Sequence, residues 1–417
     1  MSRTVIENTT YFDALNGKMH AGQTIVSEGS TITWIGDAGS FEREAADHII
    51  AGEGKYLIPG MMDCHTHLSF KPSPYMEKET VRTNDDMYHY IALKHAQDHL
   101  IAGFTTVREV GTMYPRVTSS MKRIIDQGMF TGPRILSAAA FLSQYGRAEE
   151  VGPDALREFA RKREASGRDE IIRGVRQRRA DGADLIKTQT TGGVLHGQAS
   201  KLQHSLWRDE ELEIMVDEAH RLDMHCAAHA HGDYGIMKAA AFGFDTIEHG
   251  TYMSEETAEL MIKNGTYLIP TETAVQGLKK PEIYAEMAPE VKIKIDQANE
   301  HMFANHKMAF EKGVNIAVGT DCGTPANPHG ATAVEVANMV NVIGMTPTQA
   351  LQAATIEAAK AIKIPDLVGS ITVGKSADMV LLEKNPVDDI SVLQDFTNIL
   401  KVVMRGKPVA EKGKLIP

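Results

Sequence analysis

Eight short apolar runs alternate with amphipathic stretches along the middle of the chain, and this alternation constrains the fold more than any other feature. The predicted strands are Leu57–His67, Thr105–Val110, Arg134–Ala140, Asp184–Gln189, His225–Ala230, Thr246–His249, Tyr267–Thr271 and Asn315–Gly319. The helix candidates between them are Met87–Ala102, Val117–Gln127, Ala155–Ala180, Asp209–Leu222, Tyr234–Phe242, Glu255–Asn264 and Pro289–Lys312. Repeated strand–helix units of this kind form parallel sheets. Eight of them predict an α/β fold, a (β/α)8 TIM barrel whose active site lies at the C-terminal ends of the strands.

The two ends of the chain differ from this middle part. Short strands separated by turns fill residues 1–58, at Thr4–Glu7, Thr24–Ser27 and Thr31–Ile35. A helical run reaches Ile362, and strands return at Met379–Leu382 and Ile399–Met404. We therefore expect a barrel over residues 59–362, and a small β-sandwich formed jointly by residues 1–58 and 363–417.

Composition narrows the class of protein. The 417 residues suffice for a large core, and the net charge of −11 without a basic cluster argues against nucleic acid or an anionic membrane as partner. The polar N-terminus predicts no signal peptide, and no apolar run approaches the length of a membrane span. Three scattered cysteines fit a reducing compartment. We expect a cytoplasmic enzyme that acts on a small molecule and forms a homo-oligomer.

Ionisable residues gather at the ends of five predicted strands. His65 and His67 share one face of the first, because side chains alternate along a strand. The other residues of this group are Lys187, His229, His231, His249 and Asp321. Each alone has an ordinary explanation: a hydrogen-bonded histidine, a turn-forming aspartate or a solvated lysine. Their convergence on the catalytic face of one barrel predicts a metal site instead.

Lys187 requires a chemical explanation, since an ammonium group repels cations. A desolvated lysine loses its proton easily, and the free amine can take up carbon dioxide to give a carbamate that bridges two metals. Imidazoles and carboxylates around it suit Zn²⁺. The predicted cofactors are therefore two divalent metal ions, with zinc preferred, and carbon dioxide as the carbamate on Lys187. Cys64 and Cys322, adjacent to ligands in sequence, should face away and pack as small apolar residues.

Several motifs together resemble the amidohydrolase superfamily. They are Pro59-Gly60 with Asp63-x-His65-x-His67, Lys187, His229, Ile247-Glu248-His249-Gly250, Gly319-Thr320-Asp321 and the tail Gly374–Val380. The chain looks most similar to the imidazolonepropionase-like group, which includes prolidase-type dipeptidases, carboxypeptidases and N-acyl-amino-acid hydrolases. The resemblance implies one metal on His65, His67 and Asp321. It implies a second metal on His229 and His249, with carboxylated Lys187 as the bridge.

One loop departs from the pattern of this group. Relatives often have Gly-Gly-His after the third strand, where this chain has Leu142-Ser143-Gln144-Tyr145-Gly146. Tyr145 or His231 could then polarise the substrate carbonyl. The candidate substrate-binding residues are Tyr145, His196, His231 and Tyr234.

The predicted reaction is hydrolysis of a C–N amide bond by a metal-activated hydroxide, with Asp321 as general base and His231 as the second catalytic residue. Dipeptides of the Xaa-Pro type or N-acyl amino acids are the expected substrates. A mononuclear cyclic-amide hydrolase or deaminase is the alternative, and Lys187 argues against it because a bridging carbamate requires two metals. An inactive scaffold protein would be expected to have lost ligands, and all six are present.

Overall fold

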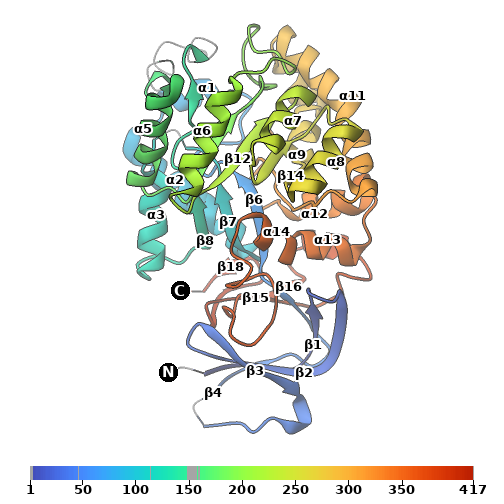
Figure 1. Cartoon of the computed structure of the whole chain (residues 1–417). Coiled ribbons are helices and arrows are strands. Elements are labelled where there is room, and N and C mark those ends of the chain that lie inside the picture. The colour runs from blue at the N-terminus through green and yellow to red at the C-terminus, as the bar shows by residue number, and fades with distance from the viewer. Residues whose placement is uncertain (1–2, 46, 113, 148–156, 158–159, 417) are drawn as a thin grey trace.

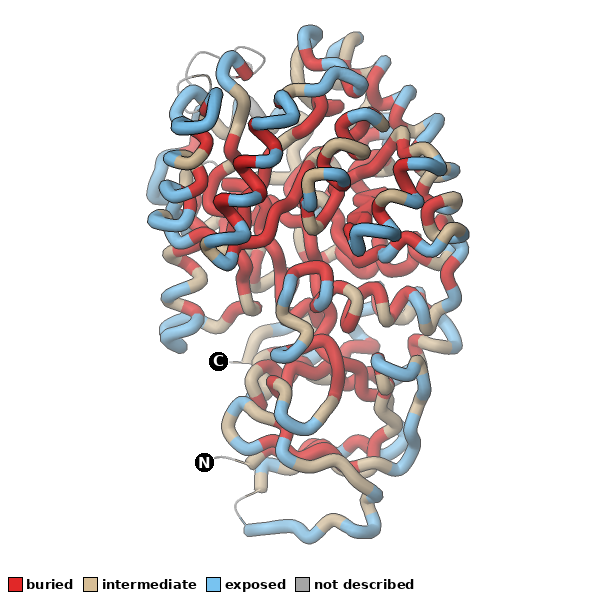
Figure 2. Tube along the Cα trace, viewed as in Figure 1, coloured by how far each residue is buried: buried red, intermediate tan, exposed pale blue. Residues whose placement is uncertain are grey.

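The computed structural model describes residues 3–45, 47–112, 114–147, 157 and 160–416. Figure 1 shows a helix-rich body above a smaller body of strands, and both chain termini lie with the smaller one. Figure 2 shows that buried residues fill the interior of the upper body and the seam between the two bodies. Within the described ranges, no helix combines the length and the apolar character needed to cross a bilayer.

Both ends of the chain contribute to one nine-stranded sheet. Its strands are β1 (Arg3–Asp13), β2 (Lys18–Glu28), β3 (Thr31–Asp37), β4 (Asp47–Ala51), β5 (Tyr56–Pro59), β15 (Met379–Leu382), β16 (Ile399–Met404), β17 (Lys407–Glu411) and β18 (Lys414–Leu415). The two ends meet where β5 pairs antiparallel with β15, with Leu57 opposite Leu381. Both side chains are buried in an apolar cluster with residues from β1, β2 and β16. The arrangement of this sheet as a two-layer sandwich stays a prediction.

The first predicted strand, Leu57–His67, is in fact two strands. β5 ends at Pro59 and pairs within the terminal sheet, whereas β6 (Met61–Thr66) pairs with β7 (Phe104–Glu109) in the upper body. Gly60 separates them. A Cβ atom on Gly60 would lie 2.0 Å from Thr105 Oγ1, so only glycine allows the backbone to pass this closely. The expectation of one continuous strand was therefore wrong.

The upper body contains two parallel sheets. One consists of β6, β7 and β8 (Arg134–Ser137); the other consists of β11 (Leu185–Gln189), β12 (His225–Ala230), β13 (Thr246–His249) and β14 (Tyr267–Ile269). The segment 315–319 lies between β14 and β6 and forms only an isolated bridge at Ile316. Backbone hydrogen bonds join these parts: Asp184 N to Ser137 O (2.7 Å), Leu268 N to Asn315 O (2.8 Å) and Cys64 N to Val318 O (2.9 Å). The eight segments follow one another in the order expected of the predicted barrel.

Helices surround these strands (Figure 1). They include α1 (Met76–Arg82), α2 (Asp85–Ile101), α3 (Val117–Asp126), α5 (Gly167–Ala180), α6 (Asp209–His220), α7 (Asp233–Ala241), α8 (Glu255–Asn264), α9 (Glu272–Leu278), α10 (Pro281–Glu286), α11 (Pro289–Lys312), α12 (Ala333–Asn338), α13 (Pro347–Ala353) and α14 (Ile356–Ala361). The helix predicted over Ala155–Ala180 is interrupted: residues 157, 160 and 161 are helical, Glu164 and Ala165 form a short strand, β10, that pairs with β9 (Ser143–Gln144), and α5 begins at Gly167. Residues 155–156 and 158–159 of that prediction lie outside the described residues.

Candidate metal centre

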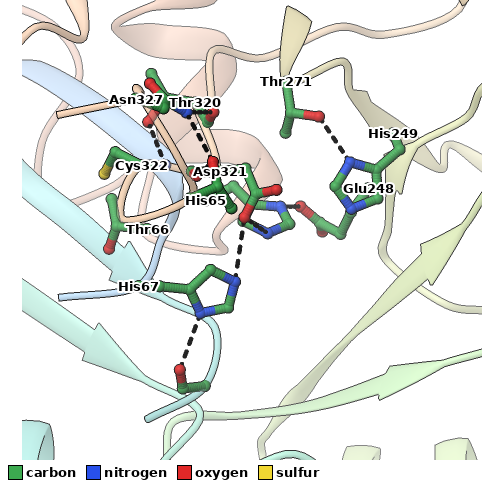
Figure 3. A network of polar contacts seen from close by, with 12 residues as sticks. His65, Thr66, His67, Glu248, His249, Thr271, Thr320, Asp321, Cys322 and Asn327 are labelled. Carbon is green, nitrogen blue, oxygen red and sulfur yellow. Dashed lines mark hydrogen bonds and ion pairs between the residues drawn. The ribbon is translucent and has the colours of Figure 1, made fainter. Parts of the chain in front are cut away.

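Three of the predicted histidine ligands are each fixed through Nδ1. His65 Nδ1 lies 2.7 Å from a Glu248 carboxylate oxygen, and His67 Nδ1 lies 2.9 Å from the carbonyl oxygen of Gly111. Carboxylate and carbonyl oxygens only accept, so both imidazoles donate there and carry the lone pair on Nε2. Figure 3 shows the contact between His65 and Glu248 and the bond from His249 to Thr271. Histidines that bind metals are oriented in this way by their second nitrogen.

Asp321 faces the first pair of histidines. Its Oδ1 atom lies 3.3 Å from His65 Nε2 and 3.2 Å from His67 Nε2 (Figure 3). Burial raises the pKa of the Asp321 carboxyl, but the interactions with His65 and His67 outweigh burial and lower the pKa overall. A carboxylate oxygen and two imidazole lone pairs directed at one point repel one another unless a cation lies between them. These three side chains therefore fit a metal ion.

His229, His231 and His249 form the other half of the site. The ring centroids of His229 and His249 lie 4.4 Å apart, and that of His231 lies 4.7 Å from His229. The Nε2 atoms of His229 and His231 are buried without a hydrogen-bond partner among the described residues. Buried polar atoms are normally satisfied, so these two nitrogens point to a missing ligand.

Two threonines distinguish the roles of His249 and His231. Thr271 donates its hydroxyl to Pro270 O at 2.7 Å, so it accepts from His249 Nδ1, also at 2.7 Å, and leaves a lone pair on His249 Nε2. Thr251 Oγ1 lies 2.7 Å from His231 Nδ1 and has no other acceptor recorded in the described part of the chain. We therefore assign the Thr251 hydroxyl as donor, which leaves an N–H on His231 Nε2. His249 then suits a metal, and His231 suits a substrate oxygen.

Lys187 completes the set. It is the third residue of β11, is 2% exposed and lines the same cavity as the histidines and Asp321. Desolvation by burial lowers the pKa of its ammonium group to about 8, against the opposing effect of Glu248 and Asp321. At a pH near 8 a substantial share of Lys187 is therefore the neutral amine, which is the form that can react with carbon dioxide.

A buried ion pair beneath the histidines escaped the sequence analysis. Arg108 is fully buried and donates to a Glu248 carboxylate oxygen at 2.8 Å, to Cys64 O at 2.6 Å and to Thr246 Oγ1 at 3.0 Å. Burial raises the pKa of Glu248, but the charges of Arg108 and Lys187 and the bond to His65 lower it overall. The sequence signal that could have revealed it is the charged pair at the end of β7, Arg108-Glu109, together with the glutamate immediately before His249 in β13.

The cavity above the site has a volume of about 250 Å³. Part of its wall is apolar and consists of Phe70, Met76, Phe141, Val194, Leu195 and Leu278. Arg147 lines the cavity as well, and its guanidinium lies 3.0 Å from Gln189 Oε1 and 3.0 Å from His196 Nδ1. Burial lowers the pKa of Arg147 to about 10, so it remains a cation at neutral pH. The sequence analysis did not single out Arg147, which sits in a polar loop.

The structure places the four predicted substrate-binding residues in two groups. His196 and His231 line the cavity. Tyr145 is 74% exposed, and Tyr234, at 49% exposure, borders a separate depression near the start of α6; neither is in the described lining of the cavity. Tyr234 is the second residue of α7, where Lys238 lies over its ring one turn further along.

A parallel α/β fold with histidines, an aspartate and a lysine at its strand ends defines the class as hydrolytic enzymes that act on C–N bonds. The model of the amidohydrolase family matches residues 56–409, and the chain belongs to this family. The resemblance found in the sequence is thereby confirmed.

Three relatives show where the chain lies within the family. It superposes on the crystal structure of a Xaa-Pro dipeptidase with methionine bound in the active site, with a TM-score of 0.87 and 32% identity, covering 98% of this chain and 99% of that one. It is 29% identical to ochratoxinase of Aspergillus niger over 84% of this chain and 75% of the relative. It is 25% identical to imidazolonepropionase of Rhizobium rhizogenes over 93% and 92% of the two chains. Hydrolysis of amide bonds is the activity these similarities support.

Proposed function

We propose that the chain is a binuclear metal-dependent hydrolase built on a (β/α)8 barrel, and that it cleaves dipeptides or N-acyl amino acids. The observation that carries the proposal is the convergence of unpartnered histidine nitrogens, Asp321 and Lys187 in one cavity with the buried cation Arg147. The Xaa-Pro dipeptidase with a free amino acid in its active site supports the substrate class.

The residues present would hold two metals. His65, His67 and Asp321 suit one, His229 and His249 suit the other, and carboxylated Lys187 suits the bridge between them. When bound, zinc or a similar divalent ion supplies a water whose pKa is lowered to about 7 and a Lewis acid for the carbonyl.

The chain's own groups then move the protons. Asp321 takes the proton of the attacking water and returns it to the nitrogen that leaves. His231, fixed through Thr251, donates its Nε2–H to the carbonyl oxygen, where negative charge develops in the transition state. The C–N bond breaks, and an acid and an amine leave the cavity.

Charge in the cavity favours a substrate with a carboxylate. Among the described lining residues Asp321 is the only carboxylate, whereas Arg147 and Arg163 are both cations. Arg147 donates hydrogen bonds to Gln189, Ser200 and His196, and burial lowers the pKa of His196 to about 3. The planar guanidinium matches a carboxylate in a bidentate geometry. The apolar wall suits an apolar acyl group or side chain.

Removal of the Thr271 hydroxyl is expected to weaken metal binding. Thr271→Ala leaves His249 Nδ1 without its acceptor, and loss of such an orienting partner typically lowers metal affinity by about 10–100-fold. Competition with a chelator measures the affinity. Thr271→Ser, which retains the hydroxyl, should bind nearly as the wild type. Thr251→Ala should lower kcat and leave metal affinity unchanged, because Thr251 orients His231. Equal affinity in Thr271→Ala and wild type would contradict the role of His249.

Replacement of Arg147 tests the substrate class. Arg147→Met should raise KM for N-acyl amino acids and dipeptides by roughly tenfold or more, since a hydrogen bond to a charged group contributes about 1.5–3 kcal/mol. Matched substrates with the carboxylate amidated should be poor for the wild type and little affected by the substitution. Arg116→Met, which removes a 72% exposed guanidinium, controls for the loss of charge. If the wild type cleaves the amidated and free-acid substrates equally well, the carboxylate proposal fails and a neutral or cyclic amide becomes the better candidate.

A further inference from the structure

A second group of metal-binding side chains lies behind Asp321. It consists of His99 on α2, Cys322 directly after Asp321, and His329 in the loop before α12. Cys322 Sγ lies 3.3 Å from His99 Nε2 and 3.2 Å from His329 Nδ1, and the two nitrogens lie 3.3 Å from each other. Cys322 faces away from the main site as expected, yet it contacts two imidazoles and is not simply an apolar packing residue.

The hydrogen bonds around this group leave both imidazole lone pairs directed inward. His329 Nε2 lies 3.1 Å from Phe70 O, to which it must donate, so its Nδ1 atom is unprotonated. Thr332 donates to Asp63 Oδ2 at 3.1 Å and therefore accepts from His99 Nδ1, also at 3.1 Å. His99 Nε2 is then unprotonated as well.

Three electron-rich atoms thus meet with a single proton among them. The Cys322 thiol can donate to one imidazole lone pair, which leaves the other imidazole facing a nitrogen at 3.3 Å and a sulfur at 3.2 or 3.3 Å. His99 and Cys322 are at most 1% exposed, so water does not solvate their side chains freely. A buried cation would satisfy all three atoms at once.

The spacing also suits a metal. A tetrahedral zinc with Zn–N of about 2.0–2.1 Å and Zn–S of about 2.3 Å places two nitrogens ~3.3 Å apart and nitrogen and sulfur ~3.6 Å apart. The nitrogens are already at this distance, and the sulfur has to move by only a few tenths of an ångström. Each histidine has its other nitrogen on an oxygen acceptor, as do His65, His67 and His249 in the main site.

We infer that His99, Cys322 and His329 form a third metal site, selective for zinc or another thiophilic divalent ion and separate from the proposed binuclear centre. A thiolate with two imidazoles favours such ions over magnesium or calcium. A metal bound there would link α2, through His99, to the loop that carries Asp321 and Cys322 and to the loop that carries His329. We assign the site a structural role, because none of its three side chains is in the described lining of the cavity.

Cobalt substitution of the full-length protein tests this inference. The residues assigned to the binuclear centre bind through nitrogen and oxygen only, so a sulfur-to-cobalt charge-transfer band in the near ultraviolet reports Cys322 alone. We expect the band in the wild type and in Cys226→Ala, a matched change at another buried cysteine, and its loss in Cys322→Ala. Metal content should fall by one equivalent between wild type and Cys322→Ala.

The inference is overturned if the cobalt-loaded wild type has no such band, a result that does not depend on how any variant folds. It is also overturned if wild type and Cys322→Ala bind the same number of equivalents. His329→Gln, at a less buried position, provides a second variant and should also lose one equivalent. The difference between variants is the same whether the main centre holds one metal or two, so failure here is distinct from failure of the proposed function.

Discussion

Asp321→Asn is expected to lower kcat by about 10²–10⁴-fold, the typical effect of removing a general acid–base group. Asparagine has nearly the same shape and retains one oxygen toward His65 and His67, but its amide cannot accept a proton from water at neutral pH. Thermal unfolding should show a Tm close to that of the wild type. Kinetics on a cleaved N-acyl amino acid or dipeptide, with metal content measured in parallel, separates loss of proton transfer from loss of metal.

A surface substitution provides the control for Asp321. Asp388→Asn changes an exposed aspartate near the end of the chain and should leave kcat within error of the wild type. Near-normal kcat in Asp321→Asn itself, at full metal occupancy, would show that another group carries the proton.

Glu248→Gln should destabilise the protein by about 3–5 kcal/mol, because it leaves the guanidinium of Arg108 buried opposite a neutral group. Arg108 and Glu248 are both fully buried, so water cannot replace the lost charge. The same change removes the anion that orients His65 through Nδ1, and metal affinity should fall by roughly 10–100-fold. Urea unfolding of the metal-free protein and chelator competition measure the two effects separately.

A double variant separates charge from packing at this position. Glu248→Gln with Arg108→Met removes both charges and should recover part of the stability lost in Glu248→Gln alone. Glu311→Gln, which breaks the exposed pair with Lys307, should change stability by no more than about 1 kcal/mol. A loss in Glu248→Gln as small as that in Glu311→Gln would show that the buried pair does not stabilise the fold.

The family follows from the resemblance of short motifs, and the positions of the candidate metal ligands follow from short-range periodicity. Alternation along a strand places His65 and His67 on one face, and the alternation of strands with helices brings the ends of β6, β11, β12 and β13 to one edge. Lys187, His249 and Asp321 could therefore be expected near one another without knowledge of the packing.

The first predicted strand shows where local pattern was insufficient. Leu57–His67 was predicted as one strand, yet β5 and β6 belong to different sheets. The chain breaks between the two strands at Gly60, which lies close to Thr105. These residues are 45 positions apart in the sequence, so no local sequence pattern could predict their contact.

The groups that surround the ligands were decided by the tertiary structure alone. Arg108 meets Glu248 across 140 residues, and His99 meets Cys322 across 223. Arg147 reaches the cavity while Tyr145, two residues earlier, faces solvent. Which side chain a loop turns inward, and which buried charge finds a partner, depends on strand register and packing between distant segments. The sequence by itself predicts the candidate ligands of this site, but only the folded chain determines which groups orient them.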